Sequence, residues 1–232
     1  MDLWLVRSDD VAFDAPVFWD VLSSAEKERA GRFHFEKDRR SYRVTHAAKR
    51  LLLALYLKRD PRTLTFGTGE WGKPFLEGTE SSLRFNLSHS KGMTLIGVSL
   101  DRELGVDVEL LQPRDRMEPI FERFASEEER QYLESICPSD LGLSLTRWWV
   151  GKEAFIKAVG RGLSLGLSEF SLGSFADNDV SVGTIPEEFG RGGDYAIQVF
   201  QVGMDHWGSM VFPRPLSQLC FYDLNSVVTK LL

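Results

Sequence analysis

Residues 105–109, with the sequence Gly-Val-Asp-Val-Glu, bring two carboxylates to places where they could act together. The pattern predicts a short strand, on which side chains alternate between faces, so Asp107 and Glu109 share one face. Their Cα atoms would lie roughly 6.5–7 Å apart. Two charges about 5 Å apart repel by roughly 3 kcal/mol at an effective dielectric near 20. A divalent cation with oxygen ligands, or a bound proton, would offset this repulsion. An edge strand with two solvated carboxylates is the simpler alternative.

A second polar cluster follows residues 83–87, which are expected to form a strand. Asn86, Ser88, His89 and Ser90 come close together at its end. Strand ends are favoured places for binding and catalytic residues. A structural role for this single histidine is the alternative.

A glycine-rich connection over residues 67–73 precedes that strand and carries Gly72 and Lys73, followed by Pro74. Glycine allows a backbone to approach a ligand closely, and the lysine could supply positive charge. An ordinary turn explains the same residues equally well.

A helix is predicted over residues 145–159, and it carries a third carboxylate. Trp149, Glu153 and Lys157 recur every four residues, so they share one helix face. The alternative is a surface Glu–Lys pair beside a core tryptophan, which contributes only a few tenths of a kcal/mol.

A basic segment near the N-terminus marks a candidate anion site, because the chain as a whole is acidic. A solvated helix face with paired charges is the alternative. Its cations are Lys27, Arg29, Arg32, Lys37, Arg39, Arg40 and Arg43.

Composition narrows the class of protein. The chain has 232 residues, is 43% hydrophobic and 27% charged, and carries a formal net charge of -6. This acidic balance argues against general affinity for nucleic acid, which requires a basic surface.

The cysteine content and the apolar runs indicate the compartment. The two cysteines form neither a disulfide framework nor a metal-ligand pattern, so a reducing compartment is expected. The start of the chain lacks a signal-peptide pattern, and the longest apolar run, 51–57, is far shorter than the ~20 residues of a membrane span. We expect a cytoplasmic protein without membrane spans.

Periodicity predicts the elements that must position these residues. Helices are expected from Ser23–Ala25 onward, over 41–59, after Ser126 and over 145–159. The order of helix followed by strands occurs twice, in 41–99 and in 117–212. The expected strands are 3–7, 63–66, 83–87, 93–99, 104–109, 170–175, 195–202 and 209–212.

Each motif is weak alone, but their order resembles one family. Over residues 22–175 the chain resembles the 4'-phosphopantetheinyl transferases of the larger, surfactin-synthetase-activating type. The motifs that carry the resemblance are the basic segment, Gly72-Lys73-Pro74, Phe85-Asn86-Leu87-Ser88-His89-Ser90, residues 105–109, and Trp149 with Lys152-Glu153-Ala154 and Lys157.

The resemblance implies an α/β (α+β) fold that is a pseudo-dimer of two similar halves. Each half would be an antiparallel sheet packed with a long helix, and the active site would lie in the cleft between them. The implied halves are residues 1–102 and 103–232, and the implied oligomeric state is a monomer.

The implied activity is transfer of the 4'-phosphopantetheine arm of coenzyme A to a serine of an apo acyl or peptidyl carrier protein. The reaction would depend on Mg²⁺ and release adenosine 3',5'-bisphosphate. By the same resemblance, Asp107, Glu109 and Glu153 would hold the metal. Glu153, or a water on the metal beside it, would accept the serine proton, and Lys157 would neutralise charge on the leaving group together with the metal at Asp107. The implied contacts to coenzyme A are Arg29, Gly72, Lys73, Pro74, Asn86, Ser88, His89 and Lys157.

Two features go beyond the shared motifs. Glu26 stands where some relatives have a lysine, so the pocket for the 3'-phosphate is expected to be built differently, from Arg29 and Arg32. Apolar residues in 117–124, flanked by Arg114, Arg116 and Arg123, form the candidate docking surface for an acidic carrier protein. Core positions for Phe121 and Phe124 are the alternative.

Two other functions use the same groups. A metal-dependent nucleotide phosphoesterase would have water as the acceptor, and a coenzyme A-binding module would have no acceptor. Mg²⁺ and Mn²⁺ both accept oxygen ligands, and fatty-acid, polyketide and nonribosomal-peptide carriers all fit the predicted transfer.

Overall fold

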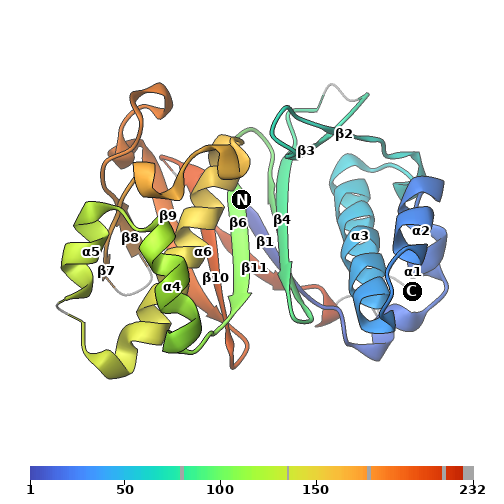
Figure 1. Cartoon of the computed structure of the whole chain (residues 1–232). Helices are drawn as coiled ribbons and strands as arrows, with labels where there is room; N and C mark the ends of the chain where they lie inside the picture. Colours follow the sequence, from blue (N-terminus) through green and yellow to red (C-terminus); the bar gives the residue numbers. More distant parts are fainter. Residues whose placement is uncertain (79–80, 135, 177–178, 216–217, 227–232) are drawn as a thin grey trace.

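The computed structural model describes residues 1–232 except 79–80, 135, 177–178, 216–217 and 227–232. The two larger sheets stand side by side, each accompanied by one long helix (Figure 1), and a two-stranded hairpin sheet forms separately from residues 66–68 and 74–76. The helices are α1 (Val17–Asp20), α2 (Ser24–Gly31), α3 (Glu36–Leu57), α4 (Arg114–Phe124), α5 (Glu127–Leu133) and α6 (Leu141–Val159). The strands are β1 (Asp2–Arg7), β2 (Phe66–Thr68), β3 (Pro74–Leu76), β4 (Arg84–Ser90), β5 (Met93–Ser99), β6 (Gly105–Leu110), β7 (Leu172–Ala176), β8 (Asp179–Val182), β9 (Tyr195–Val202), β10 (His206–Pro213) and β11 (Cys220–Asp223).

The first sheet has the strand order β11-β1-β5-β4. Its β1, β5 and β4 run antiparallel, whereas β11 returns from the other end of the chain and lies parallel to β1. The helix α3 begins at Glu36, earlier than periodicity predicts, because the polar first turn carries no apolar repeat. Acidic residues in that turn suit the positive end of the helix. Ser23 forms the predicted cap of α2, in a capping box with Glu26.

The second sheet is antiparallel throughout, with the order β6-β10-β9-β8-β7, and α6 packs on it. Gly105 permits this packing, since a Cβ at that position would lie 2.0 Å from the carbonyl oxygen of Ala154 on α6. Gly160 ends α6 with a φ of 74°, a left-handed conformation that favours glycine. The backbone of α6 therefore packs directly against β6, which places the α6 side chains close to those of β6.

Each half has its own hydrophobic core, and a third core joins the two sheets. Leu3 and Leu95 from the first sheet pack there with Val106 and Met210 from the second. Gly97 allows the close approach, because a Cβ at that position would lie 2.3 Å from a methyl group of Leu104.

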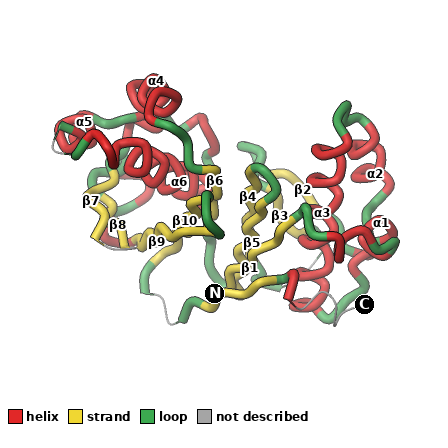
Figure 2. Tube along the Cα trace, turned by 90° about the horizontal axis from the view of Figure 1, so that it is seen from below, coloured by secondary structure: helices red, strands yellow, loops and turns green. Residues whose placement is uncertain are grey.

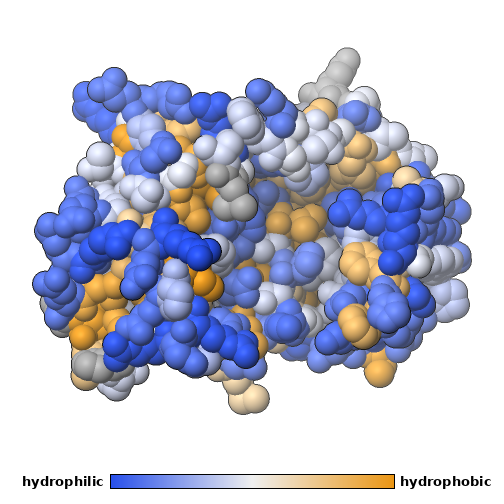
Figure 3. Space-filling model, viewed as in Figure 1, coloured by the Kyte–Doolittle hydropathy of each residue, from blue (hydrophilic) through white to orange (hydrophobic). Residues whose placement is uncertain are grey.

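The two halves meet where β4, an edge of the first sheet, lies beside β6, an edge of the second (Figure 2). The surface is hollowed between the halves, with polar and apolar patches side by side (Figure 3). No helix in the described part of the chain is long and apolar enough to cross a membrane.

The candidate docking segment on α4 needs a correction. Phe121 and Phe124 are buried in the second core against Trp148 and Trp149, so they are not available to a partner. Their helical spacing is that of a core face. Ile120 is the apolar residue of this turn that remains exposed.

Candidate functional site

Side-chain hydrogen bonds join β4 to β6 in register. The Ser88 hydroxyl donates to Asp107 Oδ1 over 2.7 Å, and the Ser90 hydroxyl donates to Glu109 Oε2, also over 2.7 Å. Both serines lie on the β4 face that is turned toward β6, because side chains two residues apart share a face. Each predicted metal-binding carboxylate on β6 therefore has a hydroxyl partner on the other half of the molecule.

Asn86 continues this row one step earlier on β4. Its side chain is buried, and its Oδ1 accepts a hydrogen bond of 2.8 Å from the backbone N–H of Val106. The residue thus connects the two edge strands. Its predicted contact with coenzyme A stays a prediction.

The helix α6 brings Glu153 and Lys157 to the same place. Lys157 Nζ donates to Asp107 Oδ1 over 2.6 Å and to the Ser88 hydroxyl over 3.0 Å. The other oxygen of Asp107, Oδ2, is buried and has no hydrogen-bond partner within the described part of the chain. An orphaned buried carboxylate oxygen is costly, so this atom marks a place where a positively charged group would be stabilised.

Burial and neighbouring negative charge raise the pKa of two of the three carboxylates, Glu109 and Glu153. Burial and the charge of Asp107 raise the pKa of Glu153 to about 7, and Glu109 adds to the rise while Lys157 opposes it. Burial also raises the pKa of Glu109, with the charge of Asp107 contributing and the Ser90 hydrogen bond opposing. Negative charge is therefore in excess here, even with Lys157 present.

A hard divalent cation fits this donor set. The available donors are carboxylate oxygens from β6 and α6, one of them without a partner, and the raised pKa values of Glu109 and Glu153 reflect charge that a cation would neutralise. Among the described residues, no three His, Cys, Asp or Glu side chains are gathered into a ready-made metal cage. The residues supply the right chemistry without a closed coordination shell.

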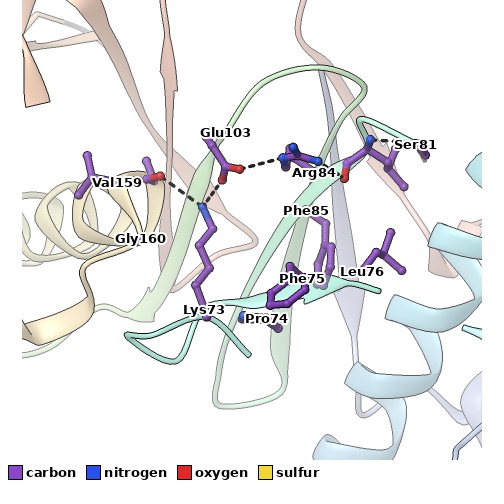
Figure 4. Close-up of a pocket in the computed structure, with 13 residues that line it drawn as sticks. Lys73, Pro74, Phe75, Leu76, Ser81, Arg84, Phe85, Glu103, Val159 and Gly160 are labelled. Atoms are coloured by element: carbon purple, nitrogen blue, oxygen red, sulfur yellow. Dashed lines mark hydrogen bonds and ion pairs between the residues drawn. The ribbon is translucent and has the colours of Figure 1, made fainter. Parts of the chain in front are cut away.

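The predicted Gly-Lys-Pro segment lies in the β2–β3 hairpin, beside a pocket of about 560 Å³ (Figure 4). Gly72 has a φ of 86°, which glycine adopts without strain and which closes the turn before Lys73. Lys73 and Pro74 line the pocket. The hairpin therefore reaches the second half of the molecule, since α6 residues form the opposite wall. The lining residues are Gly69, Lys73, Pro74, Phe75, Leu76, Ser81, Leu83, Arg84, Phe85, Glu103, Ala158, Val159 and Gly160.

His89 lies within electrostatic reach of Asp107 and Lys157, whereas Arg29 lies on another element. Partial desolvation and the nearby charge of Lys157 lower the pKa of His89, against the opposing effect of Asp107. Arg29 lies on α2 with its guanidinium 5.7 Å from the centre of the Tyr42 ring, and it lines a shallow hollow together with Arg32. The structure does not bring Arg29 into contact with the β4–β6 site.

Glu26 has a clear structural function where a relative can have lysine. Its carboxylate, largely buried, accepts from Lys49 over 3.2 Å and from Arg50 over 2.5 Å, and lies 3.3 Å from His46. Burial alone would raise the pKa of Glu26, but these partners and the Ser23 backbone hold it well below its ordinary value. The acidic residue therefore neutralises cations of α3 that would otherwise be available to an anion.

Two participants were not among the predicted site residues. Ser90 belongs to the predicted polar cluster and alternates with Ser88 on the same strand face, but its pairing with Glu109 depends on how two edge strands align. Glu103 lies in a connection, where no periodicity marks it, and yet it pairs with Lys73 Nζ over 2.7 Å.

Comparison with known proteins settles the family. Residues 103–200 match the model of the 4'-phosphopantetheinyl transferase superfamily, and residues 14–100 match the model of the 4'-phosphopantetheinyl transferase N-terminal region. A 4'-phosphopantetheinyl transferase named HetI, from Nostoc sp., is 34% identical over 164 residues, which are 70% of this chain and 69% of the relative. The chain belongs to the 4'-phosphopantetheinyl transferase superfamily.

Further relatives in this superfamily agree. A 4'-phosphopantetheinyl transferase of Bacillus subtilis is 30% identical over 162 residues, 70% of each chain. Separately, and without bearing on this assignment, the solved Chronobacterium ammoniagenes ACPS-CoA complex covers 50% of this chain and 98% of its own, with a TM-score of 0.39 and 18% identity.

The fold class expected from the resemblance is confirmed for this transferase: two halves, each a sheet that is antiparallel except for the β1–β11 pair and has one long helix, meet at the β4–β6 contact. The division at residue 102 stays a prediction, and β11 pairs with the first sheet although it follows the second in sequence.

Proposed function

We propose that this protein transfers the 4'-phosphopantetheine arm of coenzyme A to a serine hydroxyl of an apo carrier protein and releases adenosine 3',5'-bisphosphate. The observation that carries the proposal is the meeting of both halves at one charged site. There, Lys157 Nζ lies 2.6 Å from Asp107 and 3.0 Å from Ser88, and burial together with the charge of Asp107 raises the pKa of both Glu109 and Glu153. Such a site suits a substrate that carries a pyrophosphate.

Coenzyme A would lie along β4, between the hairpin pocket and the carboxylates. Lys73 and Pro74 line that pocket, and Gly72 shapes the turn beside them. Ser88 and His89 follow on β4 and could donate to phosphate oxygens. Arg29, with Arg32, would reach the substrate only at its far end, since both residues line a separate hollow beside α2.

Asp107, Glu109 and Glu153 are the residues that would hold Mg²⁺. When bound, the metal would supply neutralisation of pyrophosphate charge. The partnerless Oδ2 of Asp107 supports this assignment.

The chain's own residues would then assist one displacement. The oxygen of the carrier serine forms a bond to the phosphorus that bears pantetheine, and the bond from that phosphorus to the bridging oxygen breaks. The leaving group keeps that electron pair as adenosine 3',5'-bisphosphate. Glu153 would accept the serine proton at its carboxylate. Lys157 would donate to the leaving phosphate, where negative charge develops.

An assay with coenzyme A, Mg²⁺ and an apo carrier protein tests the proposal by following the carrier's mass. A gain of one phosphopantetheine arm supports the transferase. Release of the bisphosphate without a carrier would instead indicate the phosphoesterase. If neither product forms, the result indicates a binding module.

Two substitutions test the site residues: Asp107→Ala and Glu153→Gln should abolish transfer in folded protein. Glu187→Gln, which removes an exposed carboxylate elsewhere in the second half, should retain it.

The carrier is proposed to dock beside the cleft on α4. Ile120 is exposed there, and Arg116 and Arg123 supply positive charge for an acidic partner. We also propose that the protein acts as a monomer in the cytoplasm. Its two free cysteines suit a reducing compartment.

A further inference from the structure

The pocket beside the hairpin contains one carboxylate between two cations (Figure 4). Glu103 Oε2 lies 2.7 Å from Lys73 Nζ, and Glu103 Oε1 lies 2.9 Å from Arg84 Nε. One oxygen thus faces each cation. The three side chains come from three separate segments: the hairpin, the start of β4 and the connection before β6.

Lys73 does not depend on Glu103 for its position. Its ammonium also donates to the carbonyl oxygens of Leu104, over 3.1 Å, and Ala158, over 3.2 Å. An ammonium has three donors, so two are held by backbone and the third is directed to Glu103. Removal of the Glu103 charge would leave Lys73 fixed in the pocket wall with one donor free.

Glu103 itself is held loosely. Its side chain is 52% exposed and that of Arg84 is 46% exposed, whereas that of Lys73 is only 18% exposed. Exposed ion pairs contribute little and are screened by salt. An anion of higher charge could therefore displace this carboxylate.

Aromatic and apolar groups complete the pocket. Phe75, Phe85 and Pro74 line it together with the two cations. This combination suits a molecule that joins a flat ring to phosphate groups. On the proposed function, that molecule is the adenosine bisphosphate portion of coenzyme A.

We infer that Glu103 competes with the substrate's phosphate for Lys73 and Arg84, and so sets the affinity for coenzyme A. The inference rests on the proposed function for the identity of the ligand. Glu103 would act on binding alone. Arg84 and Ser88 are four residues apart on β4, so the pocket lies roughly 13 Å from the reacting carboxylates.

Calorimetric titration with adenosine 3',5'-bisphosphate tests this on three proteins: wild type, Glu103→Gln and Asp101→Asn. Asp101 is the matched control because it lies in the same connection and pairs with Arg102, over 3.8 Å, instead of the pocket cations. Glu103→Gln should lower the Kd about three- to tenfold, the scale of two exposed ion pairs that no longer compete. Asp101→Asn should leave the Kd within about twofold of wild type. The gain should shrink at high salt.

A weaker or unchanged Kd for Glu103→Gln would overturn the inference. A weaker Kd would show that Glu103 holds the hairpin in place, and absence of binding by wild type and variant would show that the pocket takes a different ligand. The carrier assay separates the two claims. If wild type transfers the arm and the Kd of Glu103→Gln does not fall, only the role of Glu103 fails. If wild type transfers nothing, the proposed function fails, and the titration still decides whether Glu103 competes for the bisphosphate.

Discussion

Removal of the charge of Lys152, which precedes Glu153 on α6, should cause a large loss of stability. Its side chain and that of Glu129 are both 0% exposed, and their Nζ and Oε2 atoms lie 2.8 Å apart. Lys152 Nζ also donates to the carbonyl oxygens of Phe124, Leu167 and Phe170, over 3.2, 2.6 and 2.7 Å. Lys152→Met keeps the apolar stem but leaves Glu129 as a buried charge and three carbonyls without this donor.

Removal of one partner from a buried ion pair costs about 3–5 kcal/mol. For a chain of this size, that loss lowers the melting temperature by roughly 6–20 °C. Urea unfolding followed by tryptophan fluorescence would measure the free energy of unfolding directly. The folded fraction of Lys152→Met should still transfer at a near-normal rate, because Lys152 lies on a different face of α6 from Glu153.

A double-mutant cycle shows whether the pair causes the loss. Glu129→Gln removes the buried charge and keeps one oxygen, which can accept from only one of the Ser126 and Leu172 N–H groups, because these bond to Oε2 and Oε1 over 2.8 Å each. The double variant should therefore lose less than the sum of the two single variants. A loss below about 1 kcal/mol in Lys152→Met, or strict additivity, would refute this account of the ion pair.

Further predictions concern the site and the first half. Chelation with EDTA should abolish transfer and added Mg²⁺ should restore it; undiminished activity in EDTA would contradict the metal assignment. Lys157→Met should lower the transfer rate about 100- to 1000-fold in protein that circular dichroism shows to be folded. The pKa of Glu26 is below its ordinary 4.5 in the folded state, so its contribution is full above that pH and is lost as the pH falls below it. Glu26→Gln should cost about 2 kcal/mol at pH 7 and give a shallower loss of stability between pH 5 and 3 in urea titrations. Arg116→Ala with Arg123→Ala should raise the KM for the carrier and leave the KM for coenzyme A unchanged; the reverse pattern would place docking elsewhere.

Local pattern was enough to predict the parts of the site that lie within one element. Alternation placed Asp107 and Glu109 on one face of β6, and helical spacing placed Glu153 and Lys157 on one face of α6. The periodicity of α3 and α6 likewise gave the long helix of each half. The helix α3 begins earlier than predicted because its polar first turn carries no apolar repeat, and α6 begins at Leu141, four residues before the predicted start.

Contacts between elements were beyond such patterns. The pairing of Ser88 with Asp107 depends on the relative shift of two edge strands, which the packing of the third core determines. Glu129 lies in the acidic first turn of the helix that begins after Ser126, and nothing local shows that its carboxylate meets Lys152. The family resemblance supplied the missing long-range information for the carboxylates, but not for Glu103, which lies outside the motifs.

The parallel pairing of β11 with β1 has a consequence for biosynthesis. Asn225, just after β11, accepts a hydrogen bond from the Arg7 N–H over 2.8 Å and donates one to its carbonyl over 3.2 Å, so both ends of the chain are fastened together. At 5–20 residues per second, roughly 10–40 s separate the synthesis of β1 from that of β11. Throughout that interval the outer edge of β1 has no partner. A nascent or truncated chain therefore exposes a strand edge that invites association with other chains, and translation of β11 removes this hazard.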